Sequence, residues 1–345
     1  MKRRAPTDAL AVGVDLGGTH VLATIMDPDG KVHARHKVTL TAEMRGKQDT
    51  IGDALATCII EAWRAAGSPE VRGVGVAVPG NVDPEKGLAR YLPNFGWLEP
   101  VDLTSLVLDL KPSVASKSVR ELLHIDRLHM RNDGRCAALA ERHFGVGKSG
   151  EHRVMAMLTL GTGIGGALIH DPSPSRRGEI FDGSTFDAGD FGHHVMRSGA
   201  DAYPCVCGNR GCFEQHASAA GLVRTYNKCQ PVGVSPTSLD DAKTVVERMR
   251  SGDKVASDAF RTYRTDLASG LANLVTFYNP SLIVLGGGLA RTPELYEGLE
   301  GDVDGSTLPA TRGKCRIVQS ALDADCAAMG AAWLVFAETA SADGS

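Results

Sequence analysis

The 345-residue sequence predicts an α/β protein made of two similar halves. The first observation is a series of short β-rich runs, starting at Leu10, that glycine turns separate. The second is that this pattern restarts near Arg153 without readable sequence repetition. The third is that each series is followed by segments with helical spacing and then by a buried apolar strand. The length suits about two domains, which agrees with two halves.

The first half is predicted to begin with an antiparallel meander, because its β-rich runs lie close together and the turns between them contain glycine. The next segment has apolar residues near helical spacing and stops at Gly67-Ser68-Pro69. An almost wholly apolar run then ends at Pro79-Gly80, as a buried strand does. The predicted elements are strands at 10–16, 20–26, 31–40 and 71–78 and a helix at 51–66.

Residues 81–125 are rich in loop-forming residues and predict no more than a helical insertion over 111–125. A strand near 128–131 then leads into Asp133, which opens a helix through about residue 144. The predicted elements of the second half are strands at 154–160, 167–170, 281–285 and 316–319 and helices near 213–228, 239–251, 254–278 and 324–337.

Composition excludes several classes of protein. With 37 basic and 41 acidic residues the net charge is −4, so we expect neither nucleic acid nor a membrane as a partner. The basic start of the chain is followed by an apolar run that is too short for a signal peptide, and no stretch approaches the ~18 apolar residues of a membrane span. We therefore expect a soluble cytoplasmic protein, whose eight cysteines are thiols or metal ligands.

The first candidate site is the glycine turn Gly17-Gly18-Thr19, which follows Asp15 at the end of a predicted strand. Glycines let backbone N–H groups approach phosphate oxygens, the threonine hydroxyl adds a donor, and the aspartate can hold hydrated Mg²⁺. The alternative is a tight hairpin without a ligand.

A second glycine turn, Gly161-Thr162-Gly163, again lies between predicted strands. Its extended sequence satisfies G-x-G-x-x-G, but Asp171-Pro172 follows too soon for a helix that could bind a pyrophosphate. A phosphate-binding hairpin like the first is the better interpretation. A third segment, Gly286-Gly287-Gly288, follows a buried strand and leaves room for a flat ring or a ribose, although a plain strand-to-helix turn has the same pattern.

Two further motifs indicate a candidate catalytic residue and a candidate metal site. Asp133, after Asn132 at a strand-to-helix junction, is either a helix cap or a general base for a substrate hydroxyl. Cys205, Cys207 and Cys212, with His193 or His194 upstream, supply three thiolates and an imidazole. Such a set is typical of a closed structural zinc site, and a nucleic-acid-binding zinc knuckle is the less favoured alternative.

Taken in order, these motifs resemble the ROK family of sugar kinases and sugar-responsive repressors. The two glycine turns resemble its phosphate motifs, and Ile283 to Gly288 its adenosine motif. Gly189 to His193 resembles its G-E-x-G-H motif, and Cys205 to Glu214 its zinc signature. The resemblance implies a two-lobed actin/hexokinase-like (ribonuclease H-like) α/β fold with duplicated mixed sheets and a cleft between the lobes. The expected smaller lobe is 1–131 plus 323–345, and the larger, zinc-bearing lobe is 132–322.

The resemblance also implies roles for individual residues. ATP and its phosphates would be bound by Asp15, Gly17, Gly18, Thr19, Gly161, Thr162, Gly163, Gly286, Gly287 and Gly288. Asp133 would be the general base, and the hexose would be surrounded by Gly80, Asn94, Asn132, Asp133, Asp190, His193 and Glu214. Structural Zn²⁺ would be bound by His193, Cys205, Cys207 and Cys212, which selects His193 over His194. Mg²⁺ would accompany ATP, and the protein would be a homodimer or a higher homo-oligomer.

The implied activity is phosphorylation of a hexose, with glucose as the leading substrate and N-acetylglucosamine, N-acetylmannosamine, fructose or allose as alternatives. Only 14 residues precede Asp15, so we expect no DNA-binding domain there. A sugar sensor without turnover is the alternative from another class, and Asp133 argues against it. Asp190 departs from the family, which has glutamate at that position, so either the loop over 183–192 moves inward or the pocket keeps additional room.

Overall fold

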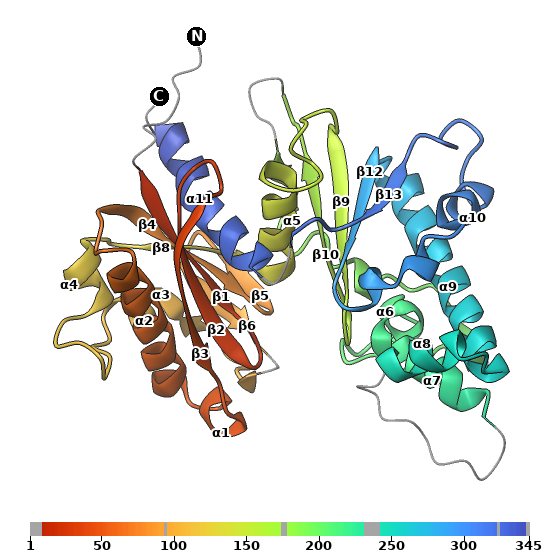
Figure 1. Ribbon diagram of the computed structural model, residues 1–345, viewed down its shortest axis with the longest axis horizontal. Coiled ribbons are helices and arrows are strands. Elements are labelled where there is room, and N and C mark those ends of the chain that lie inside the picture. The colour runs from red at the N-terminus through yellow and green to blue at the C-terminus, as the bar shows by residue number, and fades with distance from the viewer. Residues whose placement is uncertain (1–8, 93–94, 174–177, 231–241, 323–324, 343–345) are drawn as a thin grey trace. The chain divides into compact units, whose positions relative to one another are not determined.

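The structure is a computed structural model that describes residues 9–92, 95–173, 178–230, 242–322 and 325–342 (Figure 1). The chain divides into two compact units, each with its own sheet and core. Unit 1 contains Met1–Lys148, Asp182–Asp187 and Leu322–Ser345, and unit 2 contains Ser149–Phe181 and Ala188–Ala321.

The sheet of unit 1 consists of β1 (Leu10–Leu16), β2 (His20–Met26), β3 (Val32–Thr39), β4 (Val71–Val78) and β8 (Leu128–Asn132). Its strand order is β3-β2-β1-β4-β8. The first three strands pair antiparallel as predicted, and β4 and β8 join in parallel. The carboxyl ends of β1, β4 and β8 therefore meet at one edge of the sheet.

Opposite faces of this sheet are covered in different ways. The valines of β1 and β4, such as Val14 and Val76, are buried in a cluster with apolar residues of α2 (Gln48–Ala65). On the other face a Cβ at Gly13 or Gly75 would lie 1.9 Å from a carbonyl oxygen of α11 (Cys326–Ala342). Glycine at these positions lets the backbone of α11 approach the sheet directly.

Helix α5 (Asp133–His143) belongs to unit 1, so this unit extends beyond the expected boundary at residue 131. A Cβ at Gly330 of α11 would lie 1.7 Å from the carbonyl oxygen of Cys136 in α5, which shows how closely these two helices pack. The buried Glu141 also accepts a hydrogen bond from the backbone N–H of Leu322 (2.8 Å).

The loop-rich segment of unit 1 contains more structure than the sequence predicts. A small antiparallel sheet is formed by β5 (Asn81–Asp83), β6 (Leu88–Tyr91) and β7 (Val101–Asp102). The helices of the segment are α3 (Leu103–Leu108) and α4 (Val119–Leu123), and a short α1 (Ala42–Arg45) precedes α2. Helix α4 is the predicted insertion over 111–125, reduced to five residues behind a Ser118–Glu121 capping box.

Unit 2 repeats the arrangement of unit 1. Its sheet has the order β11-β10-β9-β12-β13, again with antiparallel pairs followed by parallel strands. The strands are β9 (Val154–Leu160), β10 (Ile164–His170), β11 (Glu179–Ile180), β12 (Leu282–Gly286) and β13 (Arg316–Gln319). This repetition confirms the prediction of two similar halves.

The helices of unit 2 follow the predicted order. They are α6 (Glu214–Ala217), α7 (Ala219–Lys228), α8 (Ala242–Arg250), α9 (Lys254–Tyr278) and α10 (Leu299–Gly305). Helix α10 was not predicted, and the start of the predicted helix at 239–251 lies outside the described residues. None of the helices in the described ranges combines the length and the apolar character needed to cross a membrane.

Candidate functional site

The first glycine turn joins β1 to β2 at the edge of the unit 1 sheet. The backbone N–H of Gly17 donates to the carbonyl oxygen of His20 (2.9 Å), which closes the hairpin. A Cβ at Gly18 would meet no heavy atom within 4 Å, and Thr19 is exposed. The turn is thus a tight hairpin with open space at its tip, and that space is what a phosphate group would need.

Asn132 and Asp133 lie at the same edge, where β8 passes into α5. The side chain of Asn132 accepts hydrogen bonds from the backbone N–H groups of Gly134 (3.0 Å) and Arg135 (3.4 Å) and therefore caps the helix. Because Asn132 is the cap, capping does not account for Asp133. Its Oδ1 accepts a hydrogen bond from the adjacent N–H of Gly134 (2.8 Å).

The carboxyl group of Asp15 is influenced by that of Asp133. Burial raises the pKa of Asp15 from 3.8 to about 7, and the negative charge of Asp133 adds to this effect. Burial also raises the pKa of Asp133, although the N–H of Gly134 opposes the change. A bound cation or proton would relieve the repulsion between the two groups.

Gly80 follows β4 next to these residues. Its φ of +136° suits glycine, and a Cβ would lie 2.2 Å from the carbonyl oxygen of Tyr91. The carbonyl oxygen of Gly80 accepts a hydrogen bond from the side-chain amide of Asn132 (3.1 Å). The structure thus brings Asp15, Gly80, Asn132 and Asp133 together in unit 1, whereas Asn94 lies outside the described residues.

The second glycine turn, in unit 2, is fixed by Glu214. The Oε2 of Glu214 accepts a hydrogen bond from the backbone N–H of Ile164 (2.9 Å). A Cβ at Gly163 would lie 2.3 Å from the same oxygen, so only glycine fits there without a shift. The carbonyl oxygen of Gly161 accepts the N–H of Ala219, at the start of α7 (2.8 Å).

The third glycine segment lies beside the second turn. Gly287 has a φ of +88°, and a Cβ there would lie 2.6 Å from the carbonyl oxygen of Leu160, just before that turn. A pocket of about 450 Å³ adjoins both segments. It is lined by Leu160, Gly161, Thr162, Ala219, Ala242, Lys243, Val246, Glu247, Arg250, Gly288, Leu289, Arg291 and Thr292.

Several residues of this pocket were missed by the sequence analysis. Lys243 and Arg250 are on α8, and Arg291 follows Gly288. Their charge was visible in the sequence, but a basic residue on an amphipathic helix is ordinarily solvated, so only the helix packing identifies them. Arg250 is paired with Glu294 (2.7 Å) and Lys243 with Glu247 (3.7 Å), so the wall of the pocket carries both charges.

The predicted metal ligands lie together. The ligand atoms of His193, Cys205, Cys207 and Cys212 are all within 4.8 Å of one another. The Nδ1 of His193 is 3.6 Å from the Sγ of Cys205, and the Sγ atoms of Cys207 and Cys212 are also 3.6 Å apart. His194 is engaged elsewhere, because its Nδ1 donates to the carbonyl oxygen of Phe191 (2.7 Å).

The loop before these ligands packs tightly on β10. A Cβ at Gly192 would lie 2.3 Å from the carbonyl oxygen of Ile164, and Gly189 has a φ of +98° with the backbone of Ala167 beside it. Asp190, between these glycines, is exposed. The loop backbone therefore has little space in which to move toward the sheet.

Comparisons with known proteins agree with this architecture. The model of the ROK family matches residues 11–338. The glucokinase of Thermotoga maritima is 31% identical over 335 residues, covering 94% of this chain and 96% of that protein. The N-acetylgalactosamine kinase of Shewanella sp. strain ANA-3 is 31% identical over 309 residues, covering 86% of this chain and 89% of that protein.

Among solved structures, a ROK family glucokinase from Streptomyces griseus in complex with glucose and AMPPNP has 28% sequence identity and a TM-score of 0.71. The match covers 94% of this chain and 99% of that chain. The duplicated mixed sheets and these neighbours show the actin/hexokinase-like α/β fold. The chain belongs to the ROK family.

Proposed function

We propose that this protein is an ATP-dependent sugar kinase that phosphorylates a hexose hydroxyl, with glucose as substrate and glucose 6-phosphate as product. The observation that carries the proposal is the position of Asp133. It opens α5 behind a separate capping residue, Asn132, and its charge acts on Asp15 beside the first glycine turn. The similarity to glucokinases supports the choice of glucose.

Asp133 would act as the general base. The oxygen of the sugar hydroxyl attacks the γ-phosphorus of ATP, the bond from that phosphorus to the leaving ADP oxygen breaks, and the hydroxyl proton passes to the Asp133 carboxylate. A base works best when its pKa lies near the working pH, and burial raises the pKa of Asp133 in that direction.

The glycine segments would hold ATP. The pocket beside Gly161, Thr162 and Gly288 is large enough for an adenosine moiety. In a loose phosphoryl-transfer transition state most catalysis comes from positioning and charge stabilisation, so these contacts would matter as much as the base.

Mg²⁺ fits the chemistry of Asp15. A half-buried carboxylate whose pKa is raised to about 7 is a group that gains from a nearby cation. Bound with ATP, Mg²⁺ would neutralise the phosphate charge. Asp15 would hold it through its carboxylate, and Gly17, Gly18 and Thr19 would offer backbone and hydroxyl donors to the phosphates.

Zn²⁺ fits the Cys/His cluster. A tetrahedral ion with Zn–S bonds of about 2.3 Å separates its sulfur ligands by about 3.8 Å, close to the 3.6 Å between Cys207 and Cys212. Four protein ligands leave no open position, so the ion would be structural. Glu214, the first residue of α6, follows Cys212 by two residues, and its Oε1 lies 4.0 Å from the Sγ of Cys205.

The sugar would be bound by Gly80, Asn132 and Asp133 and by Asp190, His193 and Glu214. A specific observation favours a second candidate: Asp190 stands where the ROK motif G-E-x-G-H has glutamate, and the N-acetylgalactosamine kinase relative is also 31% identical, over a shorter match than the glucokinase. An N-acetylhexosamine is therefore the alternative substrate. A sensor without turnover has no use for Asp133 as a base.

A coupled assay of ADP release tests the proposal. Wild-type protein with ATP and Mg²⁺ is offered glucose, fructose, allose, N-acetylglucosamine, N-acetylmannosamine and N-acetylgalactosamine, and the Asp133→Asn variant serves as the matched control. Sugar-dependent ADP release by the wild type alone supports a kinase, and the highest kcat/KM identifies the sugar. Sugar binding without ADP release would instead establish a sensor.

A further inference from the structure

A six-residue segment, Asp182–Asp187, belongs to unit 1 although the chain on both sides of it builds unit 2. We call this segment the strap. At its end the Oδ1 of Asp187 accepts hydrogen bonds from the side-chain amide of Asn81 (2.6 Å) and from the Nη2 of Arg90 (2.7 Å). The same Nη2 donates to the carbonyl oxygen of Thr185 (2.9 Å). Strands β5 and β6 thus each supply a donor to the carboxylate of Asp187.

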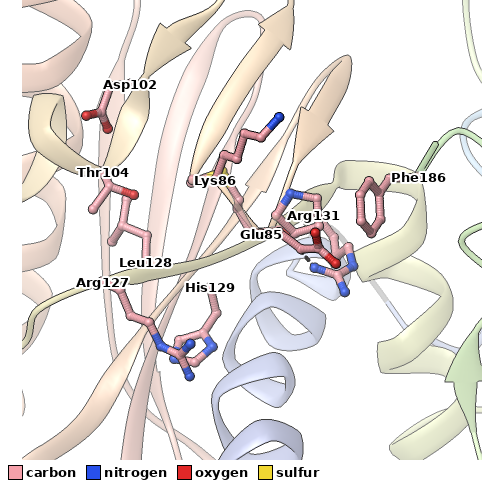
Figure 2. Close-up of a pocket in the computed structure, with 12 residues that line it drawn as sticks. Glu85, Lys86, Asp102, Thr104, Arg127, Leu128, His129, Arg131 and Phe186 are labelled. Atoms are coloured by element: carbon pink, nitrogen blue, oxygen red, sulfur yellow. Dashed lines mark hydrogen bonds between the residues drawn. The ribbon is translucent and has the colours of Figure 1, made fainter. Parts of the chain in front are cut away.

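The start of the strap is held as well. The carboxylate of Asp182 lies 3.4 Å from the Nη2 of Arg131, near the end of β8. Phe186 lines a pocket of about 420 Å³ together with Glu85 and Arg131, and Figure 2 shows its ring on the same side of the pocket as these two residues. Phe186 has a φ of +63°, a conformation that a side-chain-bearing residue keeps only when its surroundings impose it.

Asp187 is connected to the proposed sugar residues in two ways, by hydrogen bonds through Asn81 and along the chain toward Asp190. Asn81 directly follows Gly80, and the carbonyl oxygen of Gly80 accepts a hydrogen bond from Asn132, which caps the helix that begins at Asp133. Asp190 follows Asp187 by three residues, a chain length of at most about 11 Å. The carboxylate of Asp187 therefore holds the Gly80–Asn81 turn, and the chain continues from Asp187 to the Gly189–His193 loop.

The carboxylate of Asp187 is suited to holding Asn81 and Arg90. Burial alone would raise the pKa of Asp187, but the hydrogen bonds from Asn81 and Arg90 outweigh it and lower the pKa below its ordinary value. Asp187 and Arg90 are 33% and 31% exposed, so the pair is less accessible to water than most surface ion pairs. Charge-assisted hydrogen bonds of this kind are about twice as strong as neutral ones.

We propose that Asp187 is a positioning residue for the sugar: by binding Asn81 and Arg90 it fixes the Gly80–Asn81 turn, which is bonded to Asn132, in the conformation that binds the hexose. This inference rests on the proposed sugar kinase function. Because the side chain of Asp187 bonds Asn81 and Arg90 of unit 1, its loss should weaken the binding of sugar and leave the binding of ATP unchanged.

Kinetics of Asp187→Ala and Asp187→Asn test the proposal, with Asp109→Asn as the matched control. Asp109 also pairs with an arginine in unit 1, Arg120 (2.6 Å), at a distance in sequence from every proposed site residue. For Asp187→Ala we expect the KM for the sugar to rise about tenfold, as the loss of a charge-assisted hydrogen bond predicts. The KM for ATP and kcat should change less than about threefold, and Asp187→Asn should fall between Asp187→Ala and wild type.

A double-mutant cycle adds a second readout. Arg90→Gln should raise the KM for the sugar in the same way, and the double variant with Asp187→Ala should be little worse than either single variant, because both remove one interaction. A merely structural ion pair would lower Tm and change both KM values together. Additive effects, or equal changes in the KM for sugar and for ATP, would overturn the proposal.

Hydrogen exchange separates this inference from the kinase proposal. Without sugar or ATP, Asp187→Ala should speed exchange in peptides that cover 182–193 and 79–83, while Asp109→Asn should not. If exchange is faster but the protein phosphorylates no sugar, the contact made by the strap is supported and only the kinase function is rejected. Unchanged exchange together with an unchanged sugar KM would reject the positioning role in a working kinase.

Discussion

Asp15 should lower the stability of the ligand-free protein at neutral pH, and Asp15→Asn should restore it. The pKa of Asp15 is raised from 3.8 to about 7 by burial and by the charge of Asp133. The folded protein therefore keeps this proton up to about pH 7, whereas the unfolded chain releases it above about pH 3.8. Wild-type stability should fall as the pH rises between these two values, because the unfolded state then binds fewer protons than the folded state.

The size of the effect follows from the pKa. A change from 3.8 to about 7 corresponds to about 4 kcal/mol, since each tenfold change in a proton equilibrium is worth 1.36 kcal/mol. The neutral amide of Asn has no such ionisation cost. At about 2–4 °C per kcal/mol, the Tm of Asp15→Asn at pH 8 should exceed that of wild type by about 8 °C or more. At pH 5 the advantage should be less than half as large, about 1.6 kcal/mol.

Thermal unfolding without ATP, sugar or Mg²⁺, measured at pH 5 and pH 8, checks this prediction. Asp109→Asn is the control, because its carboxylate is 50% exposed beside Arg120 and should change Tm little at either pH. The same Asp15→Asn protein should lose most of its kinase rate, since the amide cannot offer a carboxylate to Mg²⁺. A Tm advantage that is equal at the two pH values, or a variant less stable than wild type at pH 8, would refute the reasoning.

The remaining predictions concern the base, the metal and the sugar. Asp133→Asn should lower kcat by about 10²–10⁴ while calorimetry shows sugar binding nearly unchanged; a variant with more than about a tenth of the wild-type rate would reduce Asp133 to a structural residue. Protein purified without chelator should contain one zinc per chain by elemental analysis, and Cys212→Ser should lose the metal and raise the sugar KM; full activity without zinc would contradict this. Asp190→Glu should change the ranking of glucose against N-acetylhexosamines by ~1–3 kcal/mol in kcat/KM, whereas a uniform loss for all sugars would exclude a selectivity role.

The regular elements were predictable because local pattern determines them. The strands at 10–16, 20–26 and 71–78 and the helix at 254–278 have the predicted bounds, since alternation, helical spacing and glycine turns are properties of neighbouring residues. Helix α10 and the sheet of β5, β6 and β7 were missed. Their strands and helix are two to seven residues long, which is too short for periodicity to distinguish them from loops.

The candidate site was predictable as a set of motifs but not as a set of contacts. The residues indicate a glycine turn, a strand-to-helix aspartate and a Cys/His cluster by themselves. They do not indicate that Asn132 caps α5. That knowledge is needed to choose between a cap and a base as the role of Asp133. Nor do they show that Glu214 contacts the second glycine turn, because 50 residues separate it from Ile164.

The packing of the loop around Asp190 bears on two sequence-based alternatives. A shorter carboxylate is compensated only if the loop moves toward the sugar, and such movement needs free backbone. Gly189 and Gly192 are packed against β10, and three residues before Asp190 the strap ends at a carboxylate that holds two donors. If this packing holds the loop in place, the missing methylene stays uncompensated, and we then expect additional room beside Asp190 for a substituent larger than a hydroxyl.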